Sequence, residues 1–139
     1  MLERNQLKMK MAKEVMTLLN DKESTKVLTS LSADGIPHTV VIGSTMAPQS
    51  DLLCAAEVLM QKTSSNLKEN KQVSILTVKG KDSYQVKAVV KEYLQDGPLF
   101  AKVKQELANK GMPCKGIWTF EPTEAYDQSA GPNAGQQIV

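Results

Sequence analysis

The pattern of hydrophobic and polar positions predicts a helix close to the start of the chain. Apolar residues recur there at the spacing that places them on one helical face: Leu7, Met11, Val15, Leu18 and Leu19. This helix is expected over about residues 6–20, within an N-terminal helical segment 1–22. Two later helices are expected, a short polar one at 66–70 and a longer one over 96–109 that stops at Gly111.

Short runs rich in β-branched residues, separated by turn residues, predict six strands. They are expected at residues 26–32, 38–45, 52–58, 73–78, 84–94 and 117–120. Asp34-Gly35 supplies the tight turn between the first two strands, since glycine accepts the positive φ that a hairpin needs. The order of elements lacks the regular βαβ alternation of a parallel nucleotide-binding sheet. We therefore expect one domain, residues 1–139, with a mainly β fold, peripheral helices and a small antiparallel barrel, ending in a polar tail at 128–139.

Composition and charge narrow the range of partners. Seventeen basic and fifteen acidic residues leave a net charge of +2, and no basic stripe alternates with aromatic residues, so we expect no nucleic-acid partner. No apolar run approaches the roughly 20 residues of a membrane span. The N-terminal residues also lack the apolar core of a signal peptide. The expectation is a cytoplasmic protein with no membrane contact.

Several familiar chemistries find no support in the residues. Cys54 and Cys114 lie far apart without CxxC spacing, and His38 is the single histidine, so no metal site is expected. Neither a GxGxxG loop nor a Walker-type loop is present. One histidine beside a turn does not make a Ser/His/acid arrangement, and no catalytic residue is assigned. His38 itself has either a structural or a functional role.

The segment 61–67, Gln-Lys-Thr-Ser-Ser-Asn-Leu, connects the third predicted strand to the short helix. Lys62, the hydroxyls of Thr63 and Ser64, and the Asn66 amide suit a phosphate, because free N–H groups and the helix dipole attract anions at a helix start. The same residue types also favour plain N-capping, and the residues alone leave both interpretations open.

Two more residues near this segment have two interpretations each. Glu57 interrupts an apolar strand just before the segment and points either out of the barrel or into a pocket. Trp118 is either a core residue or a stacking partner for a ring-shaped ligand.

Four motifs in order resemble a known family. Residues 27–40, Val-Leu-Thr-Ser-Leu-Ser-Ala-Asp-Gly-Ile-Pro-His-Thr-Val, resemble the opening hairpin of the pyridoxamine 5′-phosphate oxidase-like FMN-binding split barrels. The next three motifs of that family are matched by the third predicted strand at 52–58, the segment 61–67 and the following Val73-Ser74-Ile75-Leu76. The order of elements agrees over about residues 26–120, which is most of the chain.

The resemblance implies a six-stranded antiparallel split barrel and a homodimer with two FMN sites at the subunit interface. The FMN phosphate is expected at Lys62 and Thr63, with Ser64 and Asn66 nearby. The ring is expected along two strands, with backbone groups bonding its edge: Val41, Ile42, Gly43 and Ser44, and Ala55, Ala56 and Glu57. Trp118 and the Gly-Pro-Asn turn at 131–133 are further candidates.

The chain also departs from one branch of this family. Vitamin-making oxidases of this superfamily grip the substrate phosphate with Arg and His near the C-terminus, but this chain has one arginine, Arg4, and no histidine after His38. We therefore expect an FMN-dependent oxidoreductase or flavin reductase other than a pyridoxamine phosphate oxidase, reduced by NAD(P)H or by a redox partner protein. The alternatives are an FMN-carrying electron-transfer protein without its own substrate, and a flavin-free binding module.

Overall fold

The computed structural model describes residues 9–138, which form eight strands and three helices. The strands are β1 (Thr25–Leu31), β2 (Pro37–Val41), β3 (Met46–Gln49), β4 (Leu52–Glu57), β5 (Gln72–Lys79), β6 (Asp82–Leu94), β7 (Gly116–Asp127) and β8 (Gln136–Gln137). The helices are α2 (Lys13–Leu19), α3 (Gln61–Glu69) and α4 (Gly97–Ala108).

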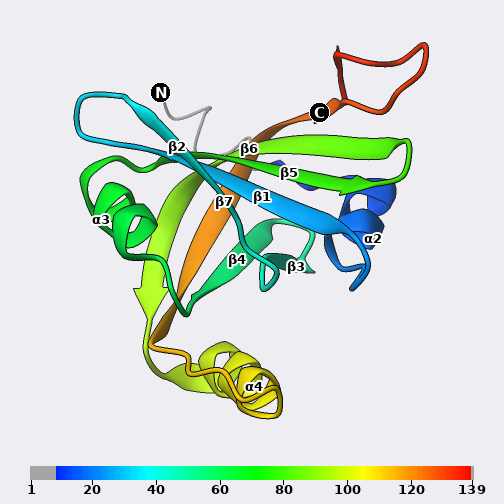
Figure 1. Cartoon of the computed structure of the whole chain (residues 1–139). Helices are drawn as coiled ribbons and strands as arrows, with labels where there is room; N and C mark the ends of the chain where they lie inside the picture. Colours follow the sequence, from blue (N-terminus) through cyan, green and yellow to red (C-terminus); the bar gives the residue numbers. More distant parts are fainter. Residues whose placement is uncertain (1–8, 139) are drawn as a thin grey trace.

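All eight strands belong to one antiparallel sheet with the order β2-β1-β5-β6-β7-β4-β3, to which β8 adds beside β7. In Figure 1 the sheet curls so that β3 and β4 lie beneath β1 and β5. β2 and β3 are consecutive in the chain but occupy opposite ends of the strand order. The barrel is therefore open between them, which gives a split barrel.

The prediction of a mainly β antiparallel barrel with peripheral helices is confirmed, but the count of six strands is wrong. β3 lies between the predicted strands 38–45 and 52–58, where no strand was expected. Its Pro48 and Gln49 are accepted because β3 pairs on one side only, where proline and polar residues are tolerated. β8 has two residues, too few for a hydrophobic period to show. The predicted strand 38–45 is also shorter. β2 ends at Val41, and the Thr45 N–H donates to the Ile42 carbonyl (3.1 Å) in a turn.

β7 is much longer than the predicted strand 117–120, since it continues through Pro122 to Asp127. The strand tolerates this proline because pairing with β4 ends at Phe120, and a register shift interrupts β6 opposite Pro122. Proline is accepted at such positions, where the ladder does not require its missing N–H.

The N-terminal helix is shorter than the predicted 6–20. Of the described residues, 9–12 precede α2 without being helical, and residues 1–8 lie outside the described part of the chain. Met9 and Met11 are nevertheless buried, and Met11 is part of the apolar pattern that predicted the helix. The Met11 N–H donates to the Ser50 carbonyl (2.7 Å) in the turn after β3. This bond to the sheet takes the place of a helical one.

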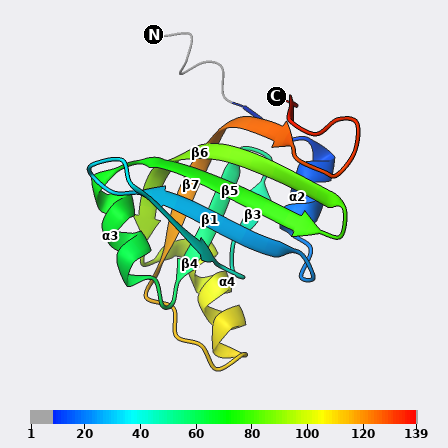
Figure 2. The same ribbon diagram turned by 45° about the horizontal axis from the view of Figure 1, so that its top comes forward.

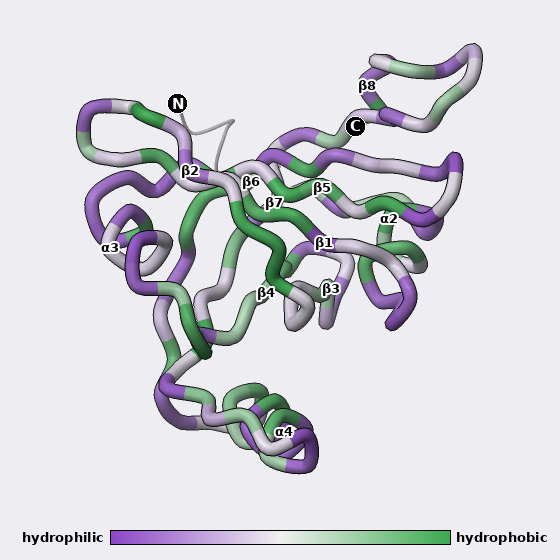
Figure 3. Tube along the Cα trace, viewed as in Figure 1, coloured by the Kyte–Doolittle hydropathy of each residue, from purple (hydrophilic) through white to green (hydrophobic). Residues whose placement is uncertain are grey.

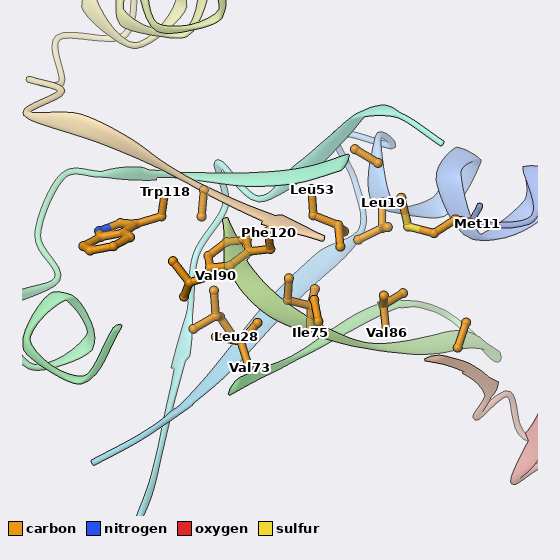
Figure 4. Close-up of a cluster of buried hydrophobic side chains, with 14 of the residues drawn as sticks. Met11, Leu19, Leu28, Leu53, Val73, Ile75, Val86, Val90, Trp118 and Phe120 are labelled. Atoms are coloured by element: carbon orange, nitrogen blue, oxygen red, sulfur yellow. The ribbon is translucent and has the colours of Figure 1, made fainter. Parts of the chain in front are cut away.

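The main core fills the barrel interior. Alternate residues of β1 and β5 are buried, as period-2 strands with one inner face require. Figure 4 shows side chains from β1, β4, β5, β6 and β7 pointing toward one another, and five of them are fully buried: Leu28, Leu53, Ile75, Val86 and Phe120. Each such side chain contributes about 1.5–3 kcal/mol on burial. Val15 and Leu19 of α2 close one end of this core.

α4 packs on a second, smaller cluster at the other end of β4 and β7. Val103 and Leu107 of α4 join Cys54, Cys114 and Ile117 there, and Figure 1 shows the helix projecting from the end of the barrel. None of the helices in residues 9–138 combines the length and apolarity needed to cross a bilayer.

The C-terminal residues fold back on the barrel. The N–H groups of Gly135 and Ile138 donate to the carbonyls of Asp127 and Ala125 (2.7 Å each). The Ser129 hydroxyl donates to the Ser83 carbonyl (3.2 Å). Figures 1 and 2 both place this hairpin at one end of the barrel and α3 at the other.

α3 is held against β1 largely by polar contacts. The buried Asn66 amide donates to the Ser30 hydroxyl (3.1 Å), and the Asn70 amide donates to the Ser32 carbonyl (3.3 Å). Leu67, 1% exposed, adds an apolar contact with the core. The position of α3 therefore depends on hydrogen bonds as much as on hydrophobic burial.

We predict that Asn66→Ala lowers the free energy of unfolding by about 1–3 kcal/mol, because it leaves the buried Ser30 hydroxyl without its partner. Urea unfolding measures this loss. Ser65→Ala, on the exposed side of the same helix, is the control and should change stability by less than about 0.5 kcal/mol. Equal effects of the two substitutions would contradict the anchoring role of Asn66.

Candidate cofactor site

α3 begins five residues earlier than the sequence predicted, at Gln61. Its inner face is made by residues at helical spacing, Met60, Thr63, Ser64 and Leu67, all buried. Two of these four are hydroxyl residues, so the hydrophobic period that usually announces a helix is hidden. The N-cap is Met60, whose side chain caps nothing. The N-capping interpretation of the hydroxyl residues is therefore wrong, since they lie inside the helix.

The first turn of α3 has the features of an anion site. Met60 provides no side-chain acceptor for the N–H groups that open the helix, and Lys62 is exposed beside them. Thr63 is 1% exposed, and its hydroxyl has no hydrogen-bond partner within residues 9–138. Free amides, the helix dipole, an ammonium group and an unpaired hydroxyl together favour an anionic oxygen ligand.

The other two predicted phosphate residues have partners within the chain. The Ser64 hydroxyl donates to the Glu57 carboxylate, and the Asn66 amide donates to Ser30. Lys62 and Thr63 thus remain available for a ligand, whereas Ser64 and Asn66 hold the helix in place.

Glu57, the last residue of β4, is the centre of a hydrogen-bonded cluster. Its carboxylate accepts the hydroxyl protons of Ser64 and Tyr93, one on each oxygen. The Trp118 indole N–H donates to the Ser64 hydroxyl oxygen (3.4 Å), and the Tyr93 and Trp118 rings lie 4.7 Å apart. Burial, together with the bond to Glu57, raises the pKa of Tyr93 to about 12, so its hydroxyl stays protonated as a donor.

Tyr93 takes part in this cluster, although no motif in the sequence indicated it. It reaches the site because β6 and β7 pair with Tyr93 opposite Trp118. A side chain at Gly116, which pairs with Glu57, would clash with the tyrosine ring, since an added Cβ would lie 2.4 Å from it. The glycine therefore makes room for Tyr93, and only the sheet register reveals this.

The predicted ring segment lies beside the same end of β4. Ser44 Oγ accepts the Ala56 N–H (3.0 Å), which joins the turn after β2 to β4. Val41 is 69% exposed, and a Cβ added at Gly43 would meet no atom within 4 Å. Thr45, 1% exposed, adds a second buried hydroxyl without a partner among the described residues.

The strand residues of the predicted ring site are less accessible. Ala55 and Ala56 are at most 1% exposed, with side chains in the two apolar clusters, and they pair with Trp118 and Ile117 of β7. A ligand here would meet their backbone rather than their methyl groups. Trp118 is itself 5% exposed and packs in the core.

Two other sequence candidates are the Gly-Pro-Asn turn and His38. The turn at 131–133 belongs to the C-terminal hairpin, at the end of the barrel away from α3 (Figure 2). His38 is half-buried in β2 opposite Ser30, the residue that holds Asn66.

The cysteines offer no reactive thiol. Both are buried, Cys54 in β4 and Cys114 before β7. Burial raises the pKa of Cys54 to about 12 and also raises the pKa of Cys114. Within residues 9–138, no three His, Cys, Asp or Glu side chains gather as metal ligands would.

Comparisons with known proteins agree with this fold. An uncharacterized protein of Methanocaldococcus jannaschii is 29% identical over 118 residues, which cover 81% of this chain and 78% of that protein. The crystal structure of an FMN-binding protein from Syntrophomonas wolfei superposes with a TM-score of 0.77 at 22% identity, covering 94% of this chain and 92% of the other. HupZ of Group A Streptococcus superposes with a TM-score of 0.75 at 19% identity, covering 90% and 99%.

The strand order and these superpositions define the chain as a split-barrel protein. The family model described as pyridoxamine 5′-phosphate oxidase matches residues 11–129. The chain belongs to this family.

Proposed function

We propose that this protein binds FMN and acts as an FMN-dependent oxidoreductase. The observation that carries the proposal is the first turn of α3, with its exposed Lys62, its amides without a side-chain cap and the unpaired buried hydroxyl of Thr63. The family to which the chain belongs and the FMN-binding protein that shares its fold give independent support.

The end of β4 relates the phosphate turn to the ring segment. Ala56 and Glu57 are consecutive, and they contact Ser44 and Ser64 respectively. The two predicted halves of the site therefore meet at one strand end. Two buried hydroxyls lack partners among the described residues: Thr63 belongs to the phosphate turn, and Thr45 directly follows the ring segment. Unpaired buried groups of this kind are costly unless a ligand or water satisfies them.

Different residues would bind different parts of the cofactor. Lys62 and Thr63 would hold the phosphate, and the backbone between Val41 and Ser44 would orient the ring through hydrogen bonds. The flavin, when bound, supplies the electron-transfer chemistry. The protein contributes binding, orientation and shielding from water.

We also propose that the protein is a homodimer in which a second copy completes the site. Val41, Val27 and Leu76 lie side by side across β2, β1 and β5 on the outer face of the sheet. Figure 3 shows the end of β2 in strongly hydrophobic colour. Val41 is 69% exposed in the single chain, and contact with a partner would bury it beside the open ring segment.

The purified protein should show the absorption bands of flavin, or acquire them on addition of FMN, and mass analysis of the released cofactor should identify FMN. Steady oxidation of NAD(P)H with an electron acceptor would support a reductase. FMN binding without such turnover, with rapid electron exchange to a partner protein, would support a carrier. A folded protein that binds no FMN would refute the proposal.

Lys62→Ala should weaken FMN binding by about 1–3 kcal/mol, or about 5- to 150-fold in Kd, because a charged hydrogen-bond partner of the phosphate is lost. Titration followed by flavin fluorescence measures the affinity. Lys68→Ala, which removes an exposed lysine from the last turn of the same helix, is the matched control. If both variants bind FMN as the unmodified protein does, Lys62 does not hold the phosphate.

Val41→Asp should dissociate the homodimer, because the free energy needed to bury a carboxylate exceeds the free energy gained from the apolar contact. Sedimentation analysis measures the mass in solution. Val89→Asp, at an exposed outer position of β6, is the control and should leave the dimer intact. A monomeric unmodified protein would refute the dimer, and a dimeric Val41→Asp variant would refute this interface.

A further inference from the structure

We infer that Glu57 is a positioning residue, which sets the first turn of α3 for a phosphate by holding Ser64. This inference rests on the proposed FMN site. The sequence predicted that Glu57 contacts the flavin ring. In the role inferred here, its carboxylate holds the helix and does not touch the ligand.

The hydrogen bond between Ser64 and Glu57 lies at the start of α3, where it controls the orientation of the first turn. The Ser64 N–H donates to the Met60 carbonyl (2.9 Å), which is the hydrogen bond that opens α3. The Ser64 hydroxyl donates to Glu57 at the end of β4. One residue thus both begins the helix and ties it to the sheet. The rotation of the first turn, and with it the direction of the amides near Lys62, is fixed by this pair of bonds.

Glu57 is itself held by residues of two other strands, β6 and β7. Its backbone is paired with Gly116 of β7, and its second carboxylate oxygen accepts the hydroxyl of Tyr93 from β6. The Tyr93 ring packs on Trp118, and the Trp118 indole N–H donates to the Ser64 hydroxyl oxygen (3.4 Å). Sites that must be precise are held by such interlocking partners, since a side chain supported on several sides loses little entropy when a ligand binds.

The direction of the hydrogen bonds argues against phosphate contact by these groups. Both oxygens of Glu57 accept hydroxyl protons, as an ionised carboxylate does. The Ser64 proton is committed to Glu57, and its oxygen receives the indole N–H. A negative carboxylate near a phosphate would repel it, so the position of Glu57 at the end of β4, just before α3, is explained by support of the first turn.

The experiment compares the affinities for FMN and for riboflavin, which lacks the phosphate. Glu57→Gln and Ser64→Ala should each weaken FMN binding by about tenfold and leave riboflavin binding within about twofold. A loss confined to the phosphate-bearing ligand separates positioning of the turn from general damage to the fold. Glu69→Gln, an exposed carboxylate on the last turn of α3, is the control and should change neither affinity.

Glu57→Asp separates the effect of side-chain length from the effect of the negative charge. It keeps the carboxylate but shortens the side chain, so it should behave like Glu57→Gln if the Ser64 contact matters. An FMN affinity equal to that of the unmodified protein in Glu57→Asp would overturn the inference, as would tighter FMN binding in Glu57→Gln. If the Glu57 variants fail to fold, Ser64→Ala decides alone.

The outcomes for the two proposals are distinct. Equal losses for FMN and riboflavin, or no loss, would overturn the positioning role while leaving FMN binding in place. Absence of FMN binding by the unmodified protein would overturn both.

Discussion

The register of β7 is the constraint on which the rest of the structure depends. This strand pairs with β6 on one side and with β4 and then β8 on the other. Its register sets Trp118 opposite Tyr93 and Ala55, and Gly116 opposite Glu57. A shift of one residue would turn every inward side chain outward. It would therefore empty the core of Phe120 and separate the Glu57 cluster at the same time.

α3 shows how a helix can be placed without a strong apolar face. Its inner residues include Thr63, Ser64 and Asn66, so burial of hydrocarbon contributes less here than for α2. Position is set instead by hydrogen bonds from Asn66 to Ser30 and from Ser64 to Glu57. Buried polar pairs are geometrically demanding, since each unmade bond is costly. A polar inner face thus makes the helix start precise, which suits a binding turn.

The proposed homodimer contact and the proposed FMN site both lie beside the open edge of the barrel. β2 and β3 stay unpaired with each other, so the turn between them, residues 42–45, is left at the seam. Among the residues that the structure describes, Ser44 and Ala56 join this turn to β4, and the Ile42 N–H donates to the Lys26 carbonyl of β1 (3.0 Å). The proposed partner and cofactor would supply the contacts that a closed barrel would have made for itself.

The parts of the fold that were predictable are those with a clear period or turn. Alternation identified β1, β5 and β6, and Asp34-Gly35 identified the first hairpin. The elements that were missed have no such period: β3 contains a proline, β8 has two residues, and the inner face of α3 is half hydroxyl. In the candidate site, residue type and order were enough to predict Lys62 and Thr63 as phosphate ligands, and this stays a prediction. Tyr93 and Thr45 were not predicted, because neither stands in a recognisable motif.

The sequence by itself determined the class of fold, the family and the segment where a phosphate is expected. Local propensities and motif order are properties of neighbouring residues, and these are readable along the chain. Only the tertiary structure decided which polar residues of that segment remain free. Ser64 is hydrogen-bonded to Glu57, seven residues away, and Asn66 is hydrogen-bonded to Ser30, 36 residues away. Hydrogen bonds between distant segments depend on strand register and helix position, and those are set by packing of the whole barrel.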